Sequence, residues 1–234
     1  MIDETDFQTF LYLAKKRYVI YVDDKKTLRS LYKEEIKFVD EIHPNDLSHL
    51  AKFIDENIYR IEKLVGNFIK DITLIIENDK ILNTDIGIKK KDTEQLQNQD
   101  NIKNYLMEVK DSFKENYQDQ VIMHMLINDS DENAIKNLSH DSYTNEGYLY
   151  LSVKFISISN NLTSVFEKIL EKHQIQVNQY MSGEYMQSFF GSDISELSIM
   201  ASKLKNGLNK NEITLVSKNT ENKGFFEKFF QLFS

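Results

Sequence analysis

The stretch YLYLSVKFISI, residues 148–158, decides how the rest of the sequence is interpreted. Four apolar side chains fall on one side of an extended chain: Leu149, Leu151, Val153 and Phe155. This alternation predicts a long β-strand with one buried face. Apolar residues at helical spacing follow a capping asparagine at position 160 or 161, and Ile175 and Val177 then begin another strand. A strand, a helix and a strand in this order predict an α/β unit.

Upstream of this stretch, the run VIMHMLI at residues 121–127 predicts another strand, and the polar residues 128–146 predict a surface loop. A helix is predicted before them from five apolar residues that share one face: Ile102, Tyr105, Leu106, Val109 and Phe113. The segment KKKDTEQLQNQ, residues 89–99, has no apolar periodicity and marks a boundary. The unit predicted for residues 91–180 therefore has the order α-β-β-α-β.

The first 90 residues predict a second α/β unit. Three short apolar stretches predict an antiparallel meander: Phe7–Ala14, Tyr18–Asp23 and Thr27–Lys33. A capped amphipathic helix is predicted from Pro44 and Asn45 to Gly66. The run ITLII and residues 80–89 predict two further strands, so the fold class is mixed α/β.

Beyond residue 180 the predicted helices and strands are shorter, and the sequence after them is polar. Two short helices are predicted at residues 182–190 and 193–204, followed by a stop at Gly207 and a strand at 212–216. Residues 181–216 therefore form a short helical remnant that returns to the first unit. The segment SKNTENKG, residues 217–224, has no apolar side chain and predicts a linker.

The last ten residues, FFEKFFQLFS at 225–234, predict an amphipathic helix that binds a membrane surface. On a helix, its apolar residues span roughly 160° of arc: Phe225, Phe226, Phe229, Phe230, Leu232 and Phe233. Lys228, on the polar side, completes the predicted membrane-binding set. The alternative is a helix that packs on the protein's own core. The bare linker and the phenylalanine face favour the bilayer interface, and a helix of about 15 Å cannot cross it.

Composition excludes several classes of protein. The chain has 234 residues, a net charge of -8 and no cysteine, so disulfides, cysteine-ligated metals and thiol nucleophiles are excluded and nucleic acid is a poor partner. The N-terminus lacks the apolar segment of a signal peptide, and no run is long enough to span a bilayer. The sequence thus predicts a peripheral protein on the cytoplasmic side of the inner membrane.

The sequence offers no catalytic constellation. The five histidines lack metal-ligand spacing, His124 lies in an apolar strand where a core histidine is expected, and no phosphate-binding glycine motif is present. The pairs Asp23–Asp24 and Asp129–Asp131 are predicted to be solvated turn residues. We therefore expect no enzyme activity, metal or cofactor. One enzyme hypothesis remains, in which His124 acts with Asp141 in a deep cleft.

The order of these parts resembles FtsA, the actin-like family of bacterial cell division. Residues 121–177 resemble its inserted subdomain, in which a strand with a central histidine precedes a loop, a long strand, a helix and a strand. Residues 1–90 resemble the first actin-like subdomain, of ribonuclease H-like fold, and KGFFEKFFQLF resembles the family's membrane-targeting helix. The resemblance implies a membrane-bound adaptor that recruits or tethers division proteins at the division site, FtsZ or later divisome components, and that self-associates.

Two departures from the family shape this expectation. The phosphate turn of actin-like proteins, Asp-x-Gly-[Thr/Ser], is replaced by Ala14 and Lys15 in LYLAKKRYV, and the second actin-like half has no counterpart. We therefore expect neither ATP binding nor ATPase activity, and the missing half is where FtsA largely contacts FtsZ. An alternative resemblance is to PilM-like adaptors of type IV pilus or secretion assembly, which share the fold with this kind of insertion.

Overall fold

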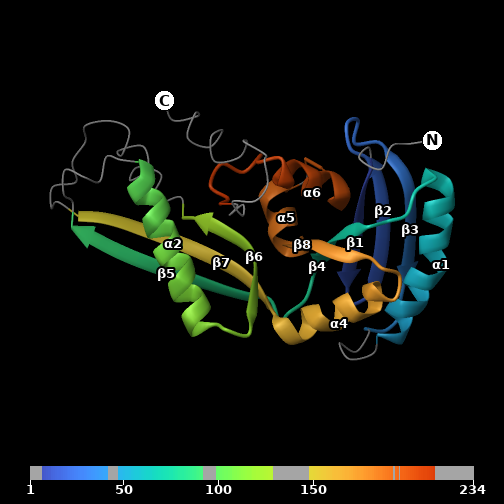
Figure 1. Cartoon of the computed structure of the whole chain (residues 1–234), viewed down its shortest axis with the longest axis horizontal. Coiled ribbons are helices and arrows are strands. Elements are labelled where there is room, and N and C mark those ends of the chain that lie inside the picture. The colour runs from blue at the N-terminus through green and yellow to red at the C-terminus, as the bar shows by residue number, and fades with distance from the viewer. Residues whose placement is uncertain are drawn as a thin grey trace. The chain divides into compact units, whose positions relative to one another are not determined.

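The computed structural model describes residues 7–41, 47–91, 99–128, 148–191, 193–194 and 196–213. The predicted helix cap at Pro44 and Asn45, the residues Asp129, Asp131 and Asp141, the linker and the C-terminal helix lie outside them. The chain forms two units (Figure 1). The larger unit comprises Met1–Ile81 and Ile158–Asn206, and the smaller unit comprises Leu82–Ser157 and Gly207–Ser234.

A five-stranded mixed sheet organises the larger unit, in the order β3-β2-β1-β4-β8. Its strands are β1 (Phe7–Ala14), β2 (Arg17–Asp24), β3 (Ser30–Lys37), β4 (Asp71–Ile76) and β8 (Gln176–Ser182). The first three form an antiparallel meander, while β1, β4 and β8 run parallel. The meander follows from the short polar breaks between these apolar stretches.

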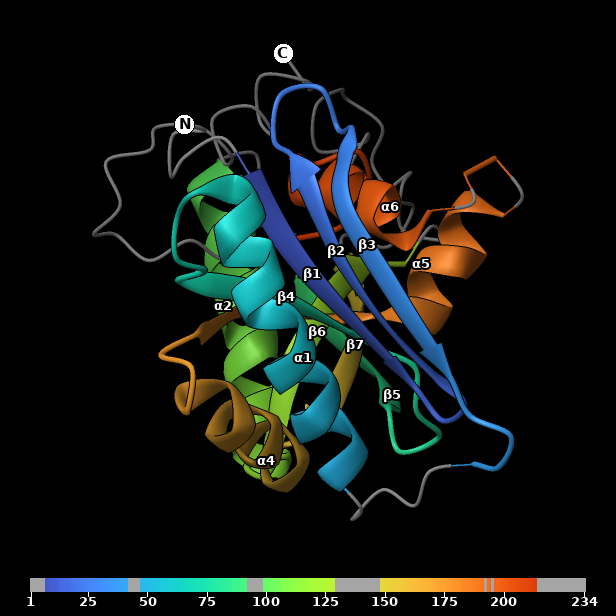
Figure 2. The ribbon, with the colours of Figure 1, turned by 90° about the vertical axis from the view of Figure 1, so that its right-hand side faces the viewer.

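Helices cover both faces of this sheet (Figure 2). Helices α1 (Ser48–Val65) and α4 (Asn160–Glu171) lie on one face, and α5 (Gly183–Phe190) and α6 (Leu197–Lys205) lie on the other. Helix α1 ends as predicted, at Gly66 with φ 77°. The cap of α4 is Ser159, whose hydroxyl accepts the N–H of Asn161, and not one of the two predicted asparagines.

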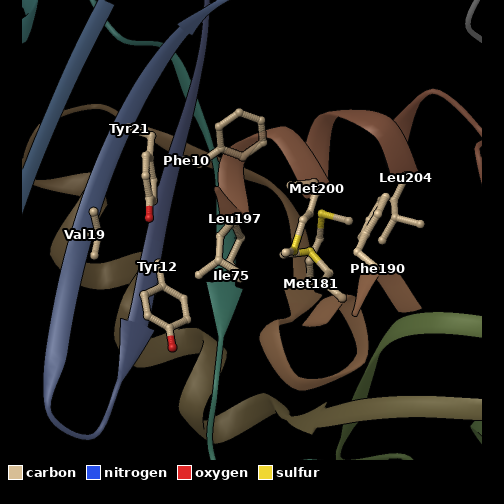
Figure 3. Close-up of a cluster of buried hydrophobic side chains, with 12 residues drawn as sticks. Phe10, Tyr12, Val19, Tyr21, Ile75, Met181, Phe190, Leu197, Met200 and Leu204 are labelled. Carbon is tan, nitrogen blue, oxygen red and sulfur yellow. The ribbon is translucent and has the colours of Figure 1, made fainter. Parts of the chain in front are cut away.

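The core between the sheet and helices α5 and α6 is rich in aromatic and methionine side chains (Figure 3). Its members come from four strands and two helices: Phe10, Tyr12, Val19, Tyr21, Ile75, Met181, Met186, Phe190, Leu197, Met200, Ala201 and Leu204. Alternation places every second residue of β1 and β2 on this face, and the residues between them face α1 and α4. Both faces of the central strands β1, β2 and β4 are therefore buried.

The smaller unit is a three-stranded sheet in the order β5-β7-β6 with one helix. Its elements are β5 (Leu82–Lys91), α2 (Gln99–Asn116), β6 (Gln120–Ile127) and β7 (Tyr148–Ser159). Strands β5 and β7 are antiparallel, with Ile86 opposite Val153. The core contains Phe113 stacked between Tyr117 and Phe155, at ring-centre distances of 4.9 and 4.5 Å.

The mixed α/β fold class and most predicted elements are confirmed, but the division into units differs from the expected boundaries at residues 90 and 180. Strand β5 belongs to the smaller unit because it pairs with β7 along its whole length. Helix α4 and strand β8 belong to the larger unit because β8 pairs with β4. Of the strand expected at 212–216, only residues 212 and 213 are described, and Glu212 forms a bridge with Leu126. Among the helices of the described residues, none is long and apolar enough to cross a membrane.

Candidate functional site

The parallel strands of the larger unit place their carboxyl ends at one edge of the sheet. Strand β1 ends at Ala14, β4 at Ile76 and β8 at Ser182. Ligands of open α/β sheets bind outside the carboxyl ends of the strands. The turn Lys15–Lys16, the segment Glu77–Asp79 and the start of α5 all follow these strand ends. This edge is therefore the candidate functional site.

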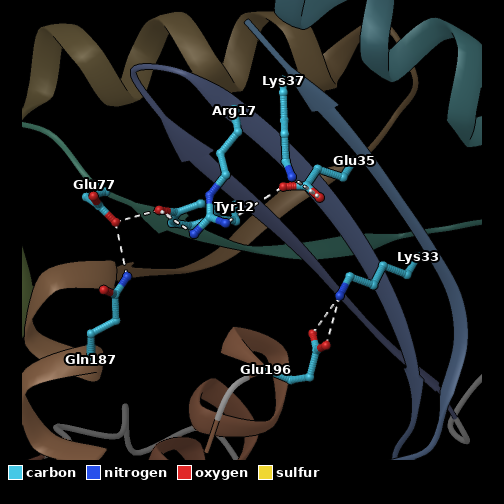
Figure 4. Close-up of polar contacts among 8 residues, drawn as sticks. All are labelled: Tyr12, Arg17, Lys33, Glu35, Lys37, Glu77, Gln187 and Glu196. Carbon is cyan, nitrogen blue, oxygen red and sulfur yellow. Dashed lines mark hydrogen bonds and ion pairs between the residues drawn. The ribbon is translucent and has the colours of Figure 1, made fainter. Parts of the chain in front are cut away.

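A network of side chains spans this edge (Figure 4). The hydroxyl of Tyr12 donates to Oε2 of Glu77 at 2.5 Å, and Nε2 of Gln187 donates to the same oxygen at 3.1 Å. Arg17 adds a cation over the Tyr12 ring, with Cζ 4.9 Å from the ring centre. Burial, with a further contribution from the bond to Glu77, raises the pKa of Tyr12 to about 12. The phenol therefore stays protonated and keeps donating to the carboxylate.

Gly183 allows helix α5 to begin directly against this network. A Cβ atom at this position would lie 3.3 Å from Cε2 of Tyr12 and 3.6 Å from Cβ of Glu77. The helix starts from Ser182, whose hydroxyl accepts the N–H of Tyr185 at 3.2 Å. Helix α5 therefore begins in contact with the network at the strand edge.

The turn between β1 and β2 is held by ion pairs. Lys15 pairs with Asp79, which follows β4, and lies 3.7 Å from Glu41. The ion pair between Lys15 and Asp79 therefore links the end of β1 to the segment that follows β4.

Two hollows lie at this edge, and residues of the network line the larger one. The smaller one, of about 270 Å³, has an apolar floor and a charged rim. Its floor is formed by Leu13, Tyr18, Leu50, Ile76, Leu162 and Phe166, and its rim includes Lys15, Glu41, Asp79 and Lys80. The larger one, of about 890 Å³, is open and mixed in charge. We call the smaller hollow the apolar socket.

Replacing Tyr12 by phenylalanine tests how much the network stabilises this edge. We expect Tyr12→Phe to lower the free energy of unfolding by about 1 kcal/mol, because Glu77 loses one of its two described side-chain donors. Denaturant unfolding measures the change. Tyr21→Phe is the matched control from the same core cluster, since the Tyr21 side chain borders a different hollow. Equal effects of the two substitutions would contradict a specific role for the Tyr12 hydroxyl.

The residues singled out in the sequence lie elsewhere. His124 is a buried core histidine, as expected, with Nδ1 2.6 Å from Oε1 of Glu212 in the smaller unit. Its expected partner in the enzyme hypothesis, Asp141, is outside the described residues, as are the membrane-binding residues from Phe225 to Phe233.

The expectation that Asp23 is solvated is wrong. Asp23 is 1% exposed because β2 continues through it, paired with Gln8 of β1. Asp24 is the last residue of β2, and its Oδ1 accepts the N–H groups of Lys26 and Thr27 in the turn that follows.

Sequence reasoning missed Tyr12, Glu77 and Gln187. Tyr12 and Glu77 are 65 positions apart, and Glu77 and Gln187 are 110 apart. One usable signal was present, a tyrosine inside an apolar strand, since a buried hydroxyl requires a partner. Its partner could not be identified without the parallel pairing of β1 and β4.

Comparison with known protein families and with curated protein sequences finds no match. Solved structures resemble the chain in part. The cytoplasmic domain of EpsL, an inner-membrane component of the type II secretion system of Vibrio cholerae, is 9% identical with a TM-score of 0.35, and the match covers 75% of this chain and 55% of that chain. The PilM–PilN type IV pilus biogenesis complex is 8% identical with a TM-score of 0.46, and the match covers 78% and 49%.

A protein of unknown function with an actin-like ATPase fold from Bacteroides thetaiotaomicron is 11% identical with a TM-score of 0.34, and the match covers 81% of this chain and 58% of that chain. This chain therefore spans about half the length of the structures it matches. None of the three is described as a cell-division protein. Such distant overlaps assign neither a family nor a partner to this chain.

Proposed function

We propose that this chain is a non-enzymatic assembly adaptor of the PilM-like kind, which binds a short apolar segment of a partner protein in the apolar socket. The C-terminal phenylalanines hold it on a membrane surface. The partner in this proposal belongs to a pilus or secretion assembly. The narrower expectation of a cell-division role gains no support from the described residues.

The hydrogen-bonded network at the strand edge is the observation that carries the proposal. Where an α/β sheet ordinarily binds a cofactor, the Tyr12 hydroxyl, Glu77 and Gln187 bind one another, and α5 begins in contact with the Tyr12 ring. The turn Lys15–Lys16 lacks the glycine that lets a backbone approach a phosphate. The edge is thus built to hold its own side chains, which suits a scaffold better than a catalyst.

The size of the apolar socket fits side chains of a peptide. Small-molecule and cofactor sites occupy roughly 300–1,000 Å³, whereas a cavity of about 150 Å³ is enough for one benzene ring. A hollow of about 270 Å³ with six apolar floor residues therefore accepts one or two leucine or phenylalanine side chains. Each contributes roughly 1.5–3 kcal/mol when fully buried. After ordering costs we expect dissociation constants between about 1 μM and 1 mM.

Titration with short peptides tests the socket. The probes are acetylated hexapeptides whose two central residues are Leu-Leu, Phe-Phe or Ser-Ser, and the readout is the backbone amide NMR signals of Leu50, Ile76 and Phe166. We expect shifts with the two apolar peptides only. Leu162→Trp, at a half-buried residue of the socket floor, abolishes them, and the matched control Lys168→Trp on the exposed side of α4 leaves them unchanged.

Two outcomes would overturn the adaptor proposal. One is binding of the Ser-Ser peptide as tightly as the two apolar peptides, which would show that the socket does not require an apolar side chain. The other is calorimetric binding of Mg-ATP at micromolar affinity, which would mean that the strand edge still accepts a nucleotide.

Removing the C-terminal helix tests the membrane part separately. We expect the full chain to sediment with phosphatidylcholine–phosphatidylglycerol liposomes and a chain ending at Lys223 to remain in the supernatant, because the six apolar residues of the predicted helix are lost. Phe229→Ser and Phe233→Ser together are expected to reproduce the loss, while Gln231→Ser on the polar side is not. Equal sedimentation of full and shortened chains would refute the membrane anchor.

A further inference from the structure

The last two turns of helix α1 and the turn after it carry three large apolar side chains that the core does not use. Tyr59 is 72% exposed, Leu64 is 56% exposed and Phe68 is 75% exposed. Single exposed apolar residues are ordinary on a protein surface. Here three of them fall in one short segment of the chain, which indicates a contact surface.

Two cations lie between the apolar side chains on the helix surface. Residues four apart on a helix are neighbours, so Lys63 lies beside Tyr59, and Leu64 lies beside Arg60. Both cations are exposed, and neither side chain has a hydrogen bond or an ion pair within the part of the chain that the structure describes. We call these residues and the one that follows the helix the α1 patch: Tyr59, Arg60, Lys63, Leu64 and Phe68.

The acidic side chains of α1, in contrast, all have described partners. They form three contacts: Asp55 with Nε2 of His173 at 2.9 Å, Glu56 with Nζ of Lys52 at 3.9 Å, and Glu62 with the N–H of Ile69 at 3.1 Å. The acids of this helix are therefore engaged within the protein, while Arg60 and Lys63 are not. The positive charge of these two side chains is available to an anionic partner, although the whole chain has a net charge of -8.

The turn that carries Phe68 is fixed on both sides. Gly66 has a left-handed backbone with φ 77°, and its N–H donates to the carbonyl of Glu62 at 2.8 Å. The side chain of Glu62 holds the N–H of Ile69, and Ile69 is buried in the core. Phe68 is thus presented to solvent by an ordered backbone. A partner that buries this ring has little backbone entropy to overcome.

We propose that the α1 patch is a membrane-contact surface of the larger unit, which binds the head-group region of an anionic bilayer. Aromatic rings and leucine side chains insert between head groups and acyl chains. Each lysine or arginine beside them increases the affinity for anionic lipid by a factor of roughly five. The centre of a protein–protein interface is depleted of charged residues, so free cations between exposed rings fit lipid head groups better than a protein partner.

The α1 patch also strengthens attachment by the C-terminal helix, a consequence that rests on the proposed function. One short phenylalanine helix binds reversibly, and a second contact on the same chain adds avidity. Leu50, on the floor of the apolar socket, lies about 20 Å along the helix axis from Leu64, so the socket remains free for a peptide. The patch itself depends only on α1 and the turn after it, so it can bind lipid even if the C-terminal anchor fails.

A single tryptophan tests the contact directly, because the natural chain has none. We expect the fluorescence of full-length Phe68→Trp to shift to the blue, and to be quenched by brominated lipid, when phosphatidylcholine–phosphatidylglycerol liposomes are added. The matched control is Phe189→Trp, at a 41% exposed residue of α5 on the other face of the sheet (Figure 2), whose spectrum should not change. An unchanged Phe68→Trp spectrum in sedimented protein would overturn the proposal. A blue shift that needs only a higher protein concentration would also overturn it, since it would indicate a protein partner.

Charge reversal tests the preference for anionic lipid. We expect Arg60→Glu with Lys63→Glu to weaken sedimentation of the full chain with these liposomes at least tenfold. Arg29→Glu with Lys114→Glu, at two exposed residues outside the α1 patch, changes the net charge equally and should have a much smaller effect. Equal effects of the two pairs would overturn the proposal. The C-terminal anchor is tested separately by Phe229→Ser with Phe233→Ser, and if only this pair abolishes sedimentation, the anchor stands and the α1 patch does not.

Discussion

Replacing Phe155 by alanine is expected to destabilise the smaller unit by about 3–5 kcal/mol. Phe155 is completely buried and stacks on Phe113, with ring planes inclined at 18°. Its removal withdraws one ring from the centre of the cluster that joins β7 to α2. Such a loss is comparable to the whole stability of a small unit.

Hydrogen exchange of backbone amides measures this effect unit by unit. We expect faster exchange in α2, β6 and β7, and unchanged protection in β1 and β4, since these strands belong to the other unit. Phe155→Leu is the control, because it keeps most of the volume and should cost less than about 1.5 kcal/mol. Uniform loss of protection in both units would mean that the two unfold together.

The elements of the fold were predictable from the sequence, and their pairing was not. Alternation along β7 and helical spacing along α1 identify which side chains are buried, because these periods follow from backbone geometry. Nothing in the periodicity says that β5 pairs with β7 while β8 pairs with β4. Pairing depends on contacts between residues far apart in the chain, and the unit boundaries depend on pairing.

The same limit explains the candidate site. The absence of glycine from the turn at Ala14, Lys15 and Lys16 could be read directly from the sequence, because a turn is a local feature. The bond from Tyr12 to Glu77 could not, since it joins the ends of two strands whose parallel pairing is not local. Asp23 shows the converse error, in which a local turn signal was overridden by the pairing of β2 with β1.

Asp23 supplies the prediction with the sharpest dependence on pH. The side chain lies under α6, and Oδ2 has no hydrogen-bond partner among the described residues. Burial raises the pKa of Asp23, while the Ser198 hydroxyl opposes the shift, Glu196 adds to it and Lys33 opposes it. The folded protein therefore holds the proton of this carboxyl more tightly than the unfolded chain does.

The sign of the effect follows from this direction. A carboxyl whose folded pKa exceeds its unfolded value, about 3.9, stabilises the fold fully below that value. The contribution is lost as the pH rises through the folded pKa. Above its folded pKa the group is a buried charge, and Oδ2 has no partner among the described residues. At a pH above that folded pKa we therefore expect Asp23→Asn to raise the free energy of unfolding by about 1–2 kcal/mol.

Thermal unfolding between pH 3 and pH 8 measures the prediction, with the neighbouring Asp24→Asn as the matched control. The pKa of Asp24 is lowered by its bonds to the N–H and hydroxyl of Thr27. Its contribution is therefore present above the unfolded pKa and is lost as the pH falls, so Asp24→Asn should destabilise the protein at pH 7. Two adjacent aspartates should thus respond to the same substitution with opposite signs. A loss of stability in Asp23→Asn at a pH above the folded pKa would mean that the buried carboxylate is compensated by contacts stronger than the one with Ser198.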